Sequence, residues 1–170
     1  ESDKWEISDM ASDYIYIAKT QININVPGTL GVIQNYSNWQ KDKKFCYPLI
    51  SKDEYLNEKN DIHPKLNFLN IELLDITDKI ITMIKGDPTI VLIIYTNNIN
   101  GLAEQRRLCI KLINSKCYAP IIINRKYNDL SIEDLQLYSA TDLGGLIVNG
   151  LGDGIFLNVR WPENLEDVNK

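Results

Sequence analysis

The most constraining feature of this chain is one uninterrupted apolar run, "TIVLIIYT" at Thr89–Thr96, which lies between two stretches with helical patterning. The run has the length of a strand and is rich in β-branched residues, whereas a membrane-spanning helix needs about 18 apolar residues or more. A strand that is apolar at every position is covered on both faces, which is typical of parallel sheets. The run therefore predicts a buried strand in an α/β fold.

Helices are predicted on both sides of this strand. Upstream, "DITDKIITMIKGDP" places apolar residues on one helical face and ends at Gly86 and Pro88, which stop helices. The residues on that face are Ile76, Ile80, Met83 and Ile84. Downstream, Asn100 is suited to cap a second helix. The expected core residues of that helix are Leu102, Cys109, Leu112 and Ile113.

The alternation continues toward the C-terminus. We expect a buried strand at Ile121–Asn124, a helix that is capped by Ser131 and runs to about Thr141, and a further strand in "GLIVN" at 145–149. Short connections between alternating strands and helices predict a mainly parallel sheet. The expected fold class is therefore α/β with alternating β-α units, TIM-barrel-like or a partial barrel. An open doubly wound sheet would satisfy the same order of elements.

The N-terminal half is less strongly patterned. Apolar and polar residues alternate at Tyr14–Ala18 and Ile22–Val26, and short apolar runs follow at Thr29–Gln34 and Tyr47–Ile50, which predicts short strands. The stretch "LNFLNIELL" fits a strand or the entry to a helix. The charged segment Lys52–Lys65 predicts a short helix and then a loop that few apolar residues anchor. We expect residues 1–170 to form a single α/β domain.

Composition narrows the range of partners. The net charge is -5 and the isoelectric point is near 4.9, so the basic surface of a nucleic-acid-binding protein is not expected. The N-terminal "ESDKWEISDM" has neither the basic region nor the apolar core of a signal peptide. We expect neither nucleic acid nor membrane as a partner. Because residue 1 is not Met, we also expect a piece excised from a larger chain.

The cysteines and the histidine do not predict a catalytic or metal site. Cys46, Cys109 and Cys117 form no C-x-x-C pair, so neither a disulfide framework nor a zinc site is indicated. Cys109 and Cys117 are expected to be small buried hydrophobes near a helix end. His63 is the only histidine and precedes Pro64 in a polar loop. We therefore assign no catalytic, cofactor-binding or metal-binding residue.

A glycine-rich stretch, "GGLIVNGLGDGIFL" at Gly144–Leu157, is the strongest local signal. Gly150, Gly152 and Gly154 alternate, whereas a dinucleotide-binding fingerprint needs G-x-G-x-x-G between a strand and a helix. We expect a structural loop at the end of the predicted strand, in which Asp153 accepts hydrogen bonds from backbone N–H groups. The alternative is a phosphate-binding nest, because glycines permit the positive φ angles that nests use.

This stretch resembles a segment of (E)-4-hydroxy-3-methylbut-2-enyl diphosphate synthase, the iron–sulfur enzyme of the methylerythritol phosphate route to isoprenoids. It is most similar to the insert domain of the long, plant-type, three-domain form, which ends in Gly-Gly, an apolar run and Gly-Leu-Gly-Asp-Gly. The upstream "AEQRRLCIKLINSKCYAPIII" is similar to the insert's helix and following strand, and "TLGVIQNYSNW" resembles an earlier strand. In short forms of the family, Gly-Ile-Gly-Asp-Thr ends the barrel domain; Gly150, Gly152 and Asp153 match it, and Gly154 replaces the Thr.

The resemblance implies a parent oxidoreductase that reductively opens 2-C-methyl-D-erythritol 2,4-cyclodiphosphate. It implies a barrel domain upstream, a domain with a [4Fe–4S] cluster downstream, a ferredoxin-type electron donor and a plastid-type organelle. This piece itself would hold no cofactor and would act as a non-catalytic spacer whose partners are the two neighbouring domains. The alternative is an independent small-molecule or phosphate-binding α/β module that uses the Gly150–Gly154 loop.

Overall fold

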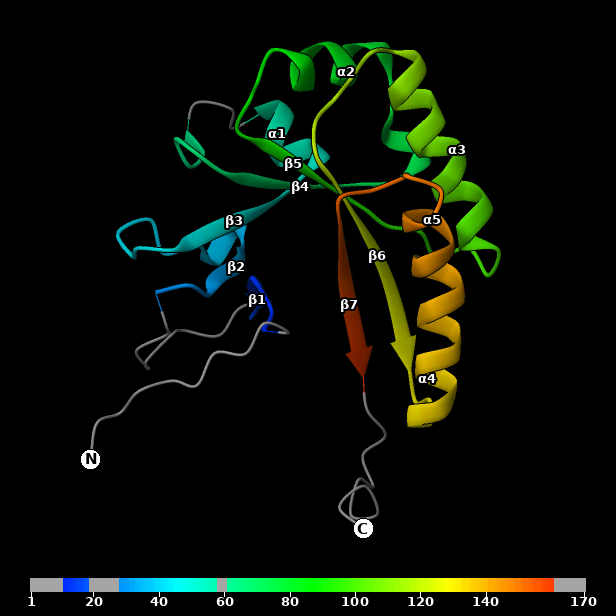
Figure 1. Ribbon diagram of the computed structural model, residues 1–170. Helices are drawn as coiled ribbons and strands as arrows, with labels where there is room; N and C mark the ends of the chain where they lie inside the picture. The colour runs from blue at the N-terminus through cyan, green and yellow to red at the C-terminus, as the bar shows by residue number, and fades with distance from the viewer. Residues whose placement is uncertain (1–10, 19–27, 58–60, 161–170) are drawn as a thin grey trace, which may run out of the picture. The chain divides into compact units, whose positions relative to one another are not determined.

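The computed structural model describes residues 11–18, 28–57 and 61–160. By its internal contacts the chain divides into two compact units, residues 1–69 and 70–170. The strands follow one another in chain order from β1 to β7, and the pairs β1–β2, β2–β3, β5–β6 and β6–β7 are parallel (Figure 1). This order, with helices between strands, confirms the predicted α/β fold of the partial-barrel type.

The first unit contains short strands and short helices. They are β1 (Tyr14–Tyr16), β2 (Gly31–Asn35), the 3-10 turn η1 (Tyr36–Asn38), β3 (Cys46–Ser51) and α1 (Lys52–Asn57). Strand β4 (Asn67–Ile71) extends over the sequence boundary between the units. The stretch "LNFLNIELL", for which a strand and a helix entry were both predicted as possible, therefore contains a strand. The predicted alternation at Ile22–Val26 lies outside the described residues.

Aromatic rings pack closely on one face of these strands. The ring of Tyr14 meets the ring of Phe68 edge-on at 5.1 Å between centroids, and that of Tyr47 at 6.1 Å. Gly31 pairs with Tyr14 in the parallel register, and a Cβ at this position would lie 2.5 Å from the Tyr14 ring. The tyrosine ring therefore occupies the space that any side chain at position 31 would need.

The charged segment after β3 begins with the predicted short helix, α1. Tyr55 of α1 is fully buried and gives this segment one apolar anchor. Further along, Nδ1 of His63 accepts hydrogen bonds from the N–H groups of Lys65 and Leu66. Burial, and next the charge of Lys65, lower the pKa of His63, which favours the neutral imidazole that this acceptor role requires. His63 is therefore a structural loop residue.

The second unit alternates strands and helices. Its elements are η3 (Leu73–Asp75), α2 (Asp78–Lys85), β5 (Ile90–Ile94), α3 (Gly101–Asn114), β6 (Ile121–Asn128), α4 (Ile132–Ser139), the π-helical turn η4 (Ala140–Gly144), α5 (Gly145–Ile147) and β7 (Gly154–Arg160). The apolar run at Thr89–Thr96 is β5, as predicted. Ser131 caps α4 as predicted, because its hydroxyl accepts a hydrogen bond from the Asp134 N–H.

The strand predicted in "GLIVN" is wrong, because Gly145–Ile147 continue a helix and residues 148–149 form a turn. Gly144 and Gly145 have helical dihedral angles, and the run from α4 through η4 passes directly into α5. Leu143 and Leu146, three residues apart, are both buried, which is the spacing of one helical face. The last strand is instead β7, so the glycine loop precedes a strand rather than ending one.

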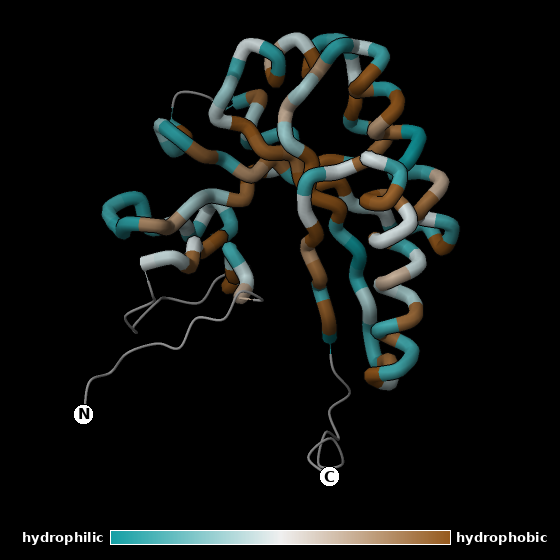
Figure 2. The backbone as a smooth tube through the Cα atoms, in the orientation of Figure 1, coloured by the Kyte–Doolittle hydropathy of each residue, from teal (hydrophilic) through white to brown (hydrophobic). Residues whose placement is uncertain are grey.

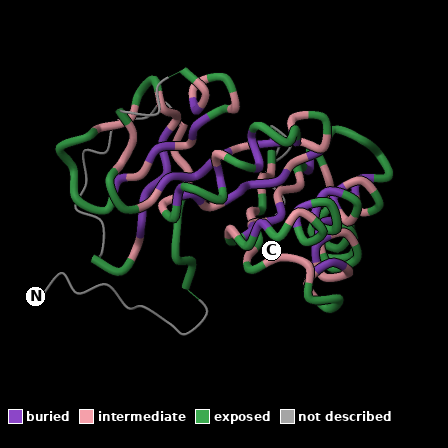
Figure 3. The backbone as a smooth tube through the Cα atoms, turned by 90° about the horizontal axis from the view of Figure 1, so that it is seen from above, coloured by how far each residue is buried: buried purple, intermediate pink, exposed green. Residues whose placement is uncertain are grey.

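The buried face of helix α3 matches the expected one only in part. Cys109 and Leu112 are buried as predicted, but Ile113 is 49% exposed, so its assignment to the core is wrong. Gln105 is buried instead, and its Nε2 donates to the carbonyl oxygens of Ile94 at 3.0 Å and Asn124 at 2.9 Å. This amide fixes α3 to both β5 and β6. In Figure 3 the buried positions lie along strands and on the inner sides of helices.

We expect Leu112→Ala to lower the free energy of unfolding by about 2–5 kcal/mol, because it leaves a cavity at a fully buried position. The matched control is Ile113→Ala in the same helix turn, which should change that free energy by no more than about 0.5 kcal/mol. Chemical denaturation of both variants measures the difference. Equal effects at the two positions would contradict the observed orientation of α3.

Candidate functional site

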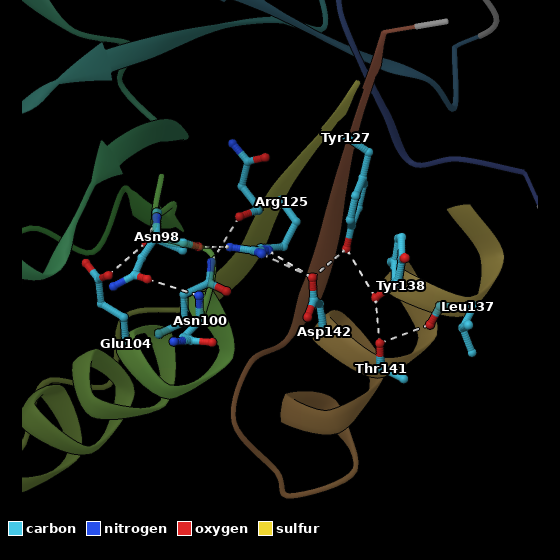
Figure 4. A network of polar contacts seen from close by, with 12 residues as sticks. Asn98, Asn100, Glu104, Arg125, Tyr127, Leu137, Tyr138, Thr141 and Asp142 are labelled. Carbon is cyan, nitrogen blue, oxygen red and sulfur yellow. Dashed lines mark hydrogen bonds and ion pairs between the residues drawn. The ribbon is translucent and has the colours of Figure 1, made fainter. Parts of the chain in front are cut away.

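The carboxyl ends of parallel strands are where α/β proteins place their ligand sites. In the second unit, polar side chains gather in the last half of β6 and in the loop after β5 (Figure 4). Arg125 of β6 is central to this group. Its Nη1 donates to the carbonyl oxygen of Asn98 at 3.1 Å, and its Nε donates to Oδ2 of Asp142 at 3.2 Å.

Asp142 receives several donors from β6. Its Oδ2 forms an ion pair with Nη2 of Arg125 at 3.2 Å and accepts a hydrogen bond from the Tyr127 hydroxyl at 3.3 Å. The two ionised side chains are only 11% and 25% exposed. Asp142 lies on the π-helical turn η4, a rare conformation that occurs frequently at functional sites. We call Arg125, Tyr127 and Asp142 the carboxyl-end cluster.

Tyr127 acts in this cluster as a protonated phenol. Its hydroxyl lies 3.3 Å from the Asp142 carboxylate and 3.3 Å from the Tyr138 carbonyl oxygen, both of which are acceptors. Burial, and then the negative charge of Asp142, raise the pKa of Tyr127 to about 12. The cluster therefore offers no general base near neutral pH from this side chain.

The start of α3 completes the surroundings of Arg125. A Cβ on Gly101, the first residue of α3, would lie 1.7 Å from Nη1 of Arg125, so the guanidinium rests directly on the helix backbone. Beside it, the Thr96 hydroxyl donates to the carboxylate of Glu104 at 2.9 Å. Each donor and acceptor described here is directed at another group of the same chain. The arrangement is suited to holding η4, β6 and the loop after β5 together.

The glycine loop lies at the other end of the strands. Oδ2 of Asp153 accepts a hydrogen bond from the N–H of Ile121 at 2.8 Å, and the Asp153 N–H donates to the Ile121 carbonyl oxygen at 2.7 Å. Asp153 thus accepts from a backbone N–H, but the partner belongs to the neighbouring strand rather than to its own turn. Gly150 and Gly152 both have positive φ angles, of 69° and 118°, and Gly154 is the first residue of β7.

The structure therefore places Gly150, Gly152, Asp153 and Gly154 at the amino ends of β6 and β7. That end of a barrel sheet contributes to stability, whereas ligands bind at the carboxyl ends. Sequence reasoning missed the carboxyl-end cluster because Arg125 and Asp142 are far apart in the chain and lie on different elements. The available signal was the alternation of Arg125 and Tyr127, which puts both on one face of β6.

The described cysteines do not fit an iron–sulfur cluster. Cluster ligands are thiolates, but Cys46, Cys109 and Cys117 are all buried free thiols. Burial raises the pKa of Cys46, and it raises that of Cys109 to about 11, so both thiols stay protonated near neutral pH. Within residues 11–18, 28–57 and 61–160, no three His, Cys, Asp or Glu side chains are grouped as metal ligands would be.

No helix among the described residues is long and apolar enough to span a membrane.

Comparison with known proteins finds relatives that all carry the same name. A protein of Parabacteroides distasonis named 4-hydroxy-3-methylbut-2-en-1-yl diphosphate synthase (flavodoxin) is 32% identical over 146 residues, which are 86% of this chain and 23% of that protein. The protein of the same name from Phocaeicola vulgatus is 29% identical over 150 residues, which are 88% of this chain and 24% of that protein. The one from Bacteroides thetaiotaomicron is 39% identical over 93 residues, which are 55% of this chain and 15% of that protein. This chain is related to these synthases.

The chain spans about a quarter or less of the length of these relatives. They are bacterial proteins, so they do not support the plant-type form or the plastid location that the sequence resemblance implies. No protein-family model matches the chain, and no solved structure matches it.

We expect Gly152→Ala to lower the free energy of unfolding by about 1–3 kcal/mol, because alanine is strained at a φ of 118°. Its Cβ would also lie 2.7 Å from the Ile123 side chain. The matched control is Gly144→Ala in the same stretch, where φ is -60° and a Cβ meets nothing within 4 Å. That variant should gain about 0.4–1 kcal/mol. Thermal and urea unfolding measure both, and a neutral Gly152→Ala would contradict the loop geometry.

The stability of the protein should depend on Tyr127 at high pH. The pKa of Tyr127 is raised in the folded state, so its contribution is complete below pH 10 and is lost as the pH rises toward 12. Urea unfolding at several pH values between 9 and 11.5 should show a steeper loss of stability in the wild type than in Tyr127→Phe, which has no ionisable group there. Identical slopes would contradict the buried environment of this hydroxyl.

Proposed function

We propose that these residues form a non-catalytic structural domain of a longer enzyme of the 4-hydroxy-3-methylbut-2-en-1-yl diphosphate synthase type. The observation that carries this proposal is the alignment itself. It covers 86% of this chain but only 23% of the Parabacteroides protein, whose length is therefore about 630 residues. A segment that makes up so small a share of the relative is best explained as one domain among several.

The side-chain chemistry supports a structural role. In the carboxyl-end cluster, the charge of Arg125 is balanced by Asp142, and Tyr127 is held protonated. In the glycine loop, Asp153 is engaged by the backbone of β6. A catalytic acid or base needs a pKa near the working pH and access to a substrate, and these groups are instead directed at the chain's own atoms.

The rest of the proposed enzyme supplies the chemistry. We infer that a barrel domain binds 2-C-methyl-D-erythritol 2,4-cyclodiphosphate, that a further domain holds a [4Fe–4S] cluster, and that a small electron carrier reduces it. The names of the relatives specify flavodoxin, whereas the sequence resemblance led us to expect a ferredoxin-type donor. In this scheme the domain described here lies between the two others as an insert and sets their spacing. The plant-type form and the plastid location remain predictions.

The test of the structural role uses the full-length enzyme. We expect Asp153→Asn and Asp142→Asn to leave turnover within a few-fold of the wild type, whereas loss of a catalytic acid or base typically costs about 10²–10⁴-fold. Steady-state turnover with a reducing system and the melting temperature are measured together. A hundredfold loss of rate at an unchanged melting temperature would place that aspartate in an active site and would favour the independent-module alternative.

The spacer role needs a second measurement. Residues 1–170 are removed from the full-length enzyme and replaced by a short flexible linker, and the product is compared with the wild type for turnover, iron content and oligomeric state. We expect the iron content to persist while turnover is lost, because the neighbouring domains would no longer be correctly spaced. Wild-type turnover with an unchanged oligomeric state would contradict the proposal.

A further inference from the structure

Burial on one face of the second unit's sheet ends abruptly at its last strand. Ile94 of β5, Ile123 of β6 and Ile155 of β7 are aligned in the parallel register and therefore lie on the same face. Ile94 and Ile123 are completely buried, but Ile155 is 52% exposed. Two positions further along β7, Leu157 is 46% exposed on the same face. We call Ile155 and Leu157 the β7 patch.

This face is the one that the helices cover. A Cβ on Gly152 would meet the side chains of both Ile123 and Ile147, so α5 lies over this face of β6. Tyr127 lies four residues after Ile123 on the same face, and its hydroxyl donates a hydrogen bond to Asp142 of η4. In Figure 1, α3 and the run from α4 to α5 lie on one side of β6. The described helices thus cover β5 and β6 and leave the β7 patch open.

The sequence of β7 is that of a covered strand. A strand with one face in water usually alternates apolar and polar residues, whereas a strand covered on both faces is apolar almost throughout. β7 reads Gly-Ile-Phe-Leu-Asn-Val and carries no charge before Arg160. Figure 2 shows β7 as largely hydrophobic, whereas the second half of β6 is hydrophilic. The composition of β7 therefore indicates that something packs on it.

The repeat of the fold indicates what that partner is. In a parallel α/β sheet each strand is followed by a helix that packs on the helix-side face, partly over the next strand and partly over the one before. Among the described residues, β7 is covered only from the side of β6, and no helix that follows β7 packs on its face. We propose that the β7 patch docks an apolar helix face from the part of the full-length protein outside residues 1–170. This rests on the proposed function, because the relatives place about three-quarters of their length outside the aligned region.

The test uses single cysteines in the full-length protein. Leu157→Cys is compared with Ile113→Cys on α3, because the two native residues are almost equally exposed here, at 46% and 49%. A maleimide reagent is added under native conditions, and labelling of each site is followed by peptide mass spectrometry. The three cysteines of residues 1–170 are buried, so they give little background. We expect Leu157→Cys to react at least tenfold more slowly than Ile113→Cys, and equally fast in urea.

Each other outcome is decisive. Equal labelling rates under native conditions would overturn the proposal, because the patch would then be open in the full-length protein. Slow labelling that becomes fast on dilution to the monomer would show that a second copy covers the patch, which also overturns it. The intact mass of the full-length protein distinguishes failure of this docking proposal from failure of the proposed function. A chain no longer than 170 residues defeats both, whereas a long chain with fast labelling defeats only the docking surface.

Discussion

The parallel pairing of β5, β6 and β7 is the constraint on which the second unit depends. In a parallel ladder each strand starts from the same end of the sheet, so every crossover must carry the chain back along one face, usually as a helix. The reciprocal hydrogen bonds between Asp153 and Ile121 set the start of the last pairing, because the carboxylate and the N–H of one residue engage the N–H and the carbonyl of the other. Everything at the opposite end of the strands is positioned by this register.

The glycine loop with Asp153 and the carboxyl-end cluster therefore lie at opposite ends of these strands. At the amino end, glycines with positive φ allow the chain to leave α5 and enter β7 within a few residues. At the carboxyl end, Arg125 and Tyr127 reach from β6 to Asp142 on a π-helical turn. Both groups use charge and hydrogen bonding to join elements that are distant in the chain. Such internally matched networks rigidify a fold when every member is satisfied.

The relation to diphosphate synthases gives these features a context. Under the proposed function, these residues contribute to a longer enzyme through rigidity and through the surfaces that they present to the rest of the chain. The exposed apolar residues of β7 contrast with the complete burial of their in-register neighbours on β5 and β6. An incomplete covering of this kind is expected of a unit that is finished by other parts of a larger protein, because apolar strand faces are stable only when water is excluded from them.

The sequence by itself determined the elements whose signals are local. The apolar run of β5, the helix α2 with its Gly86 stop, and the Ser131 cap were all predictable, because hydrophobic period and capping chemistry act within a few residues. It did not determine the conformation of Gly145–Asn149, since a short apolar run fits a strand or a helix, and burial of Leu143 and Leu146 on one helical face decided the outcome. Nor could it join Arg125 to Asp142, or aim Asp153 at Ile121. Those contacts exist only after the strands have paired in parallel, because register, not sequence distance, decides which side chains meet.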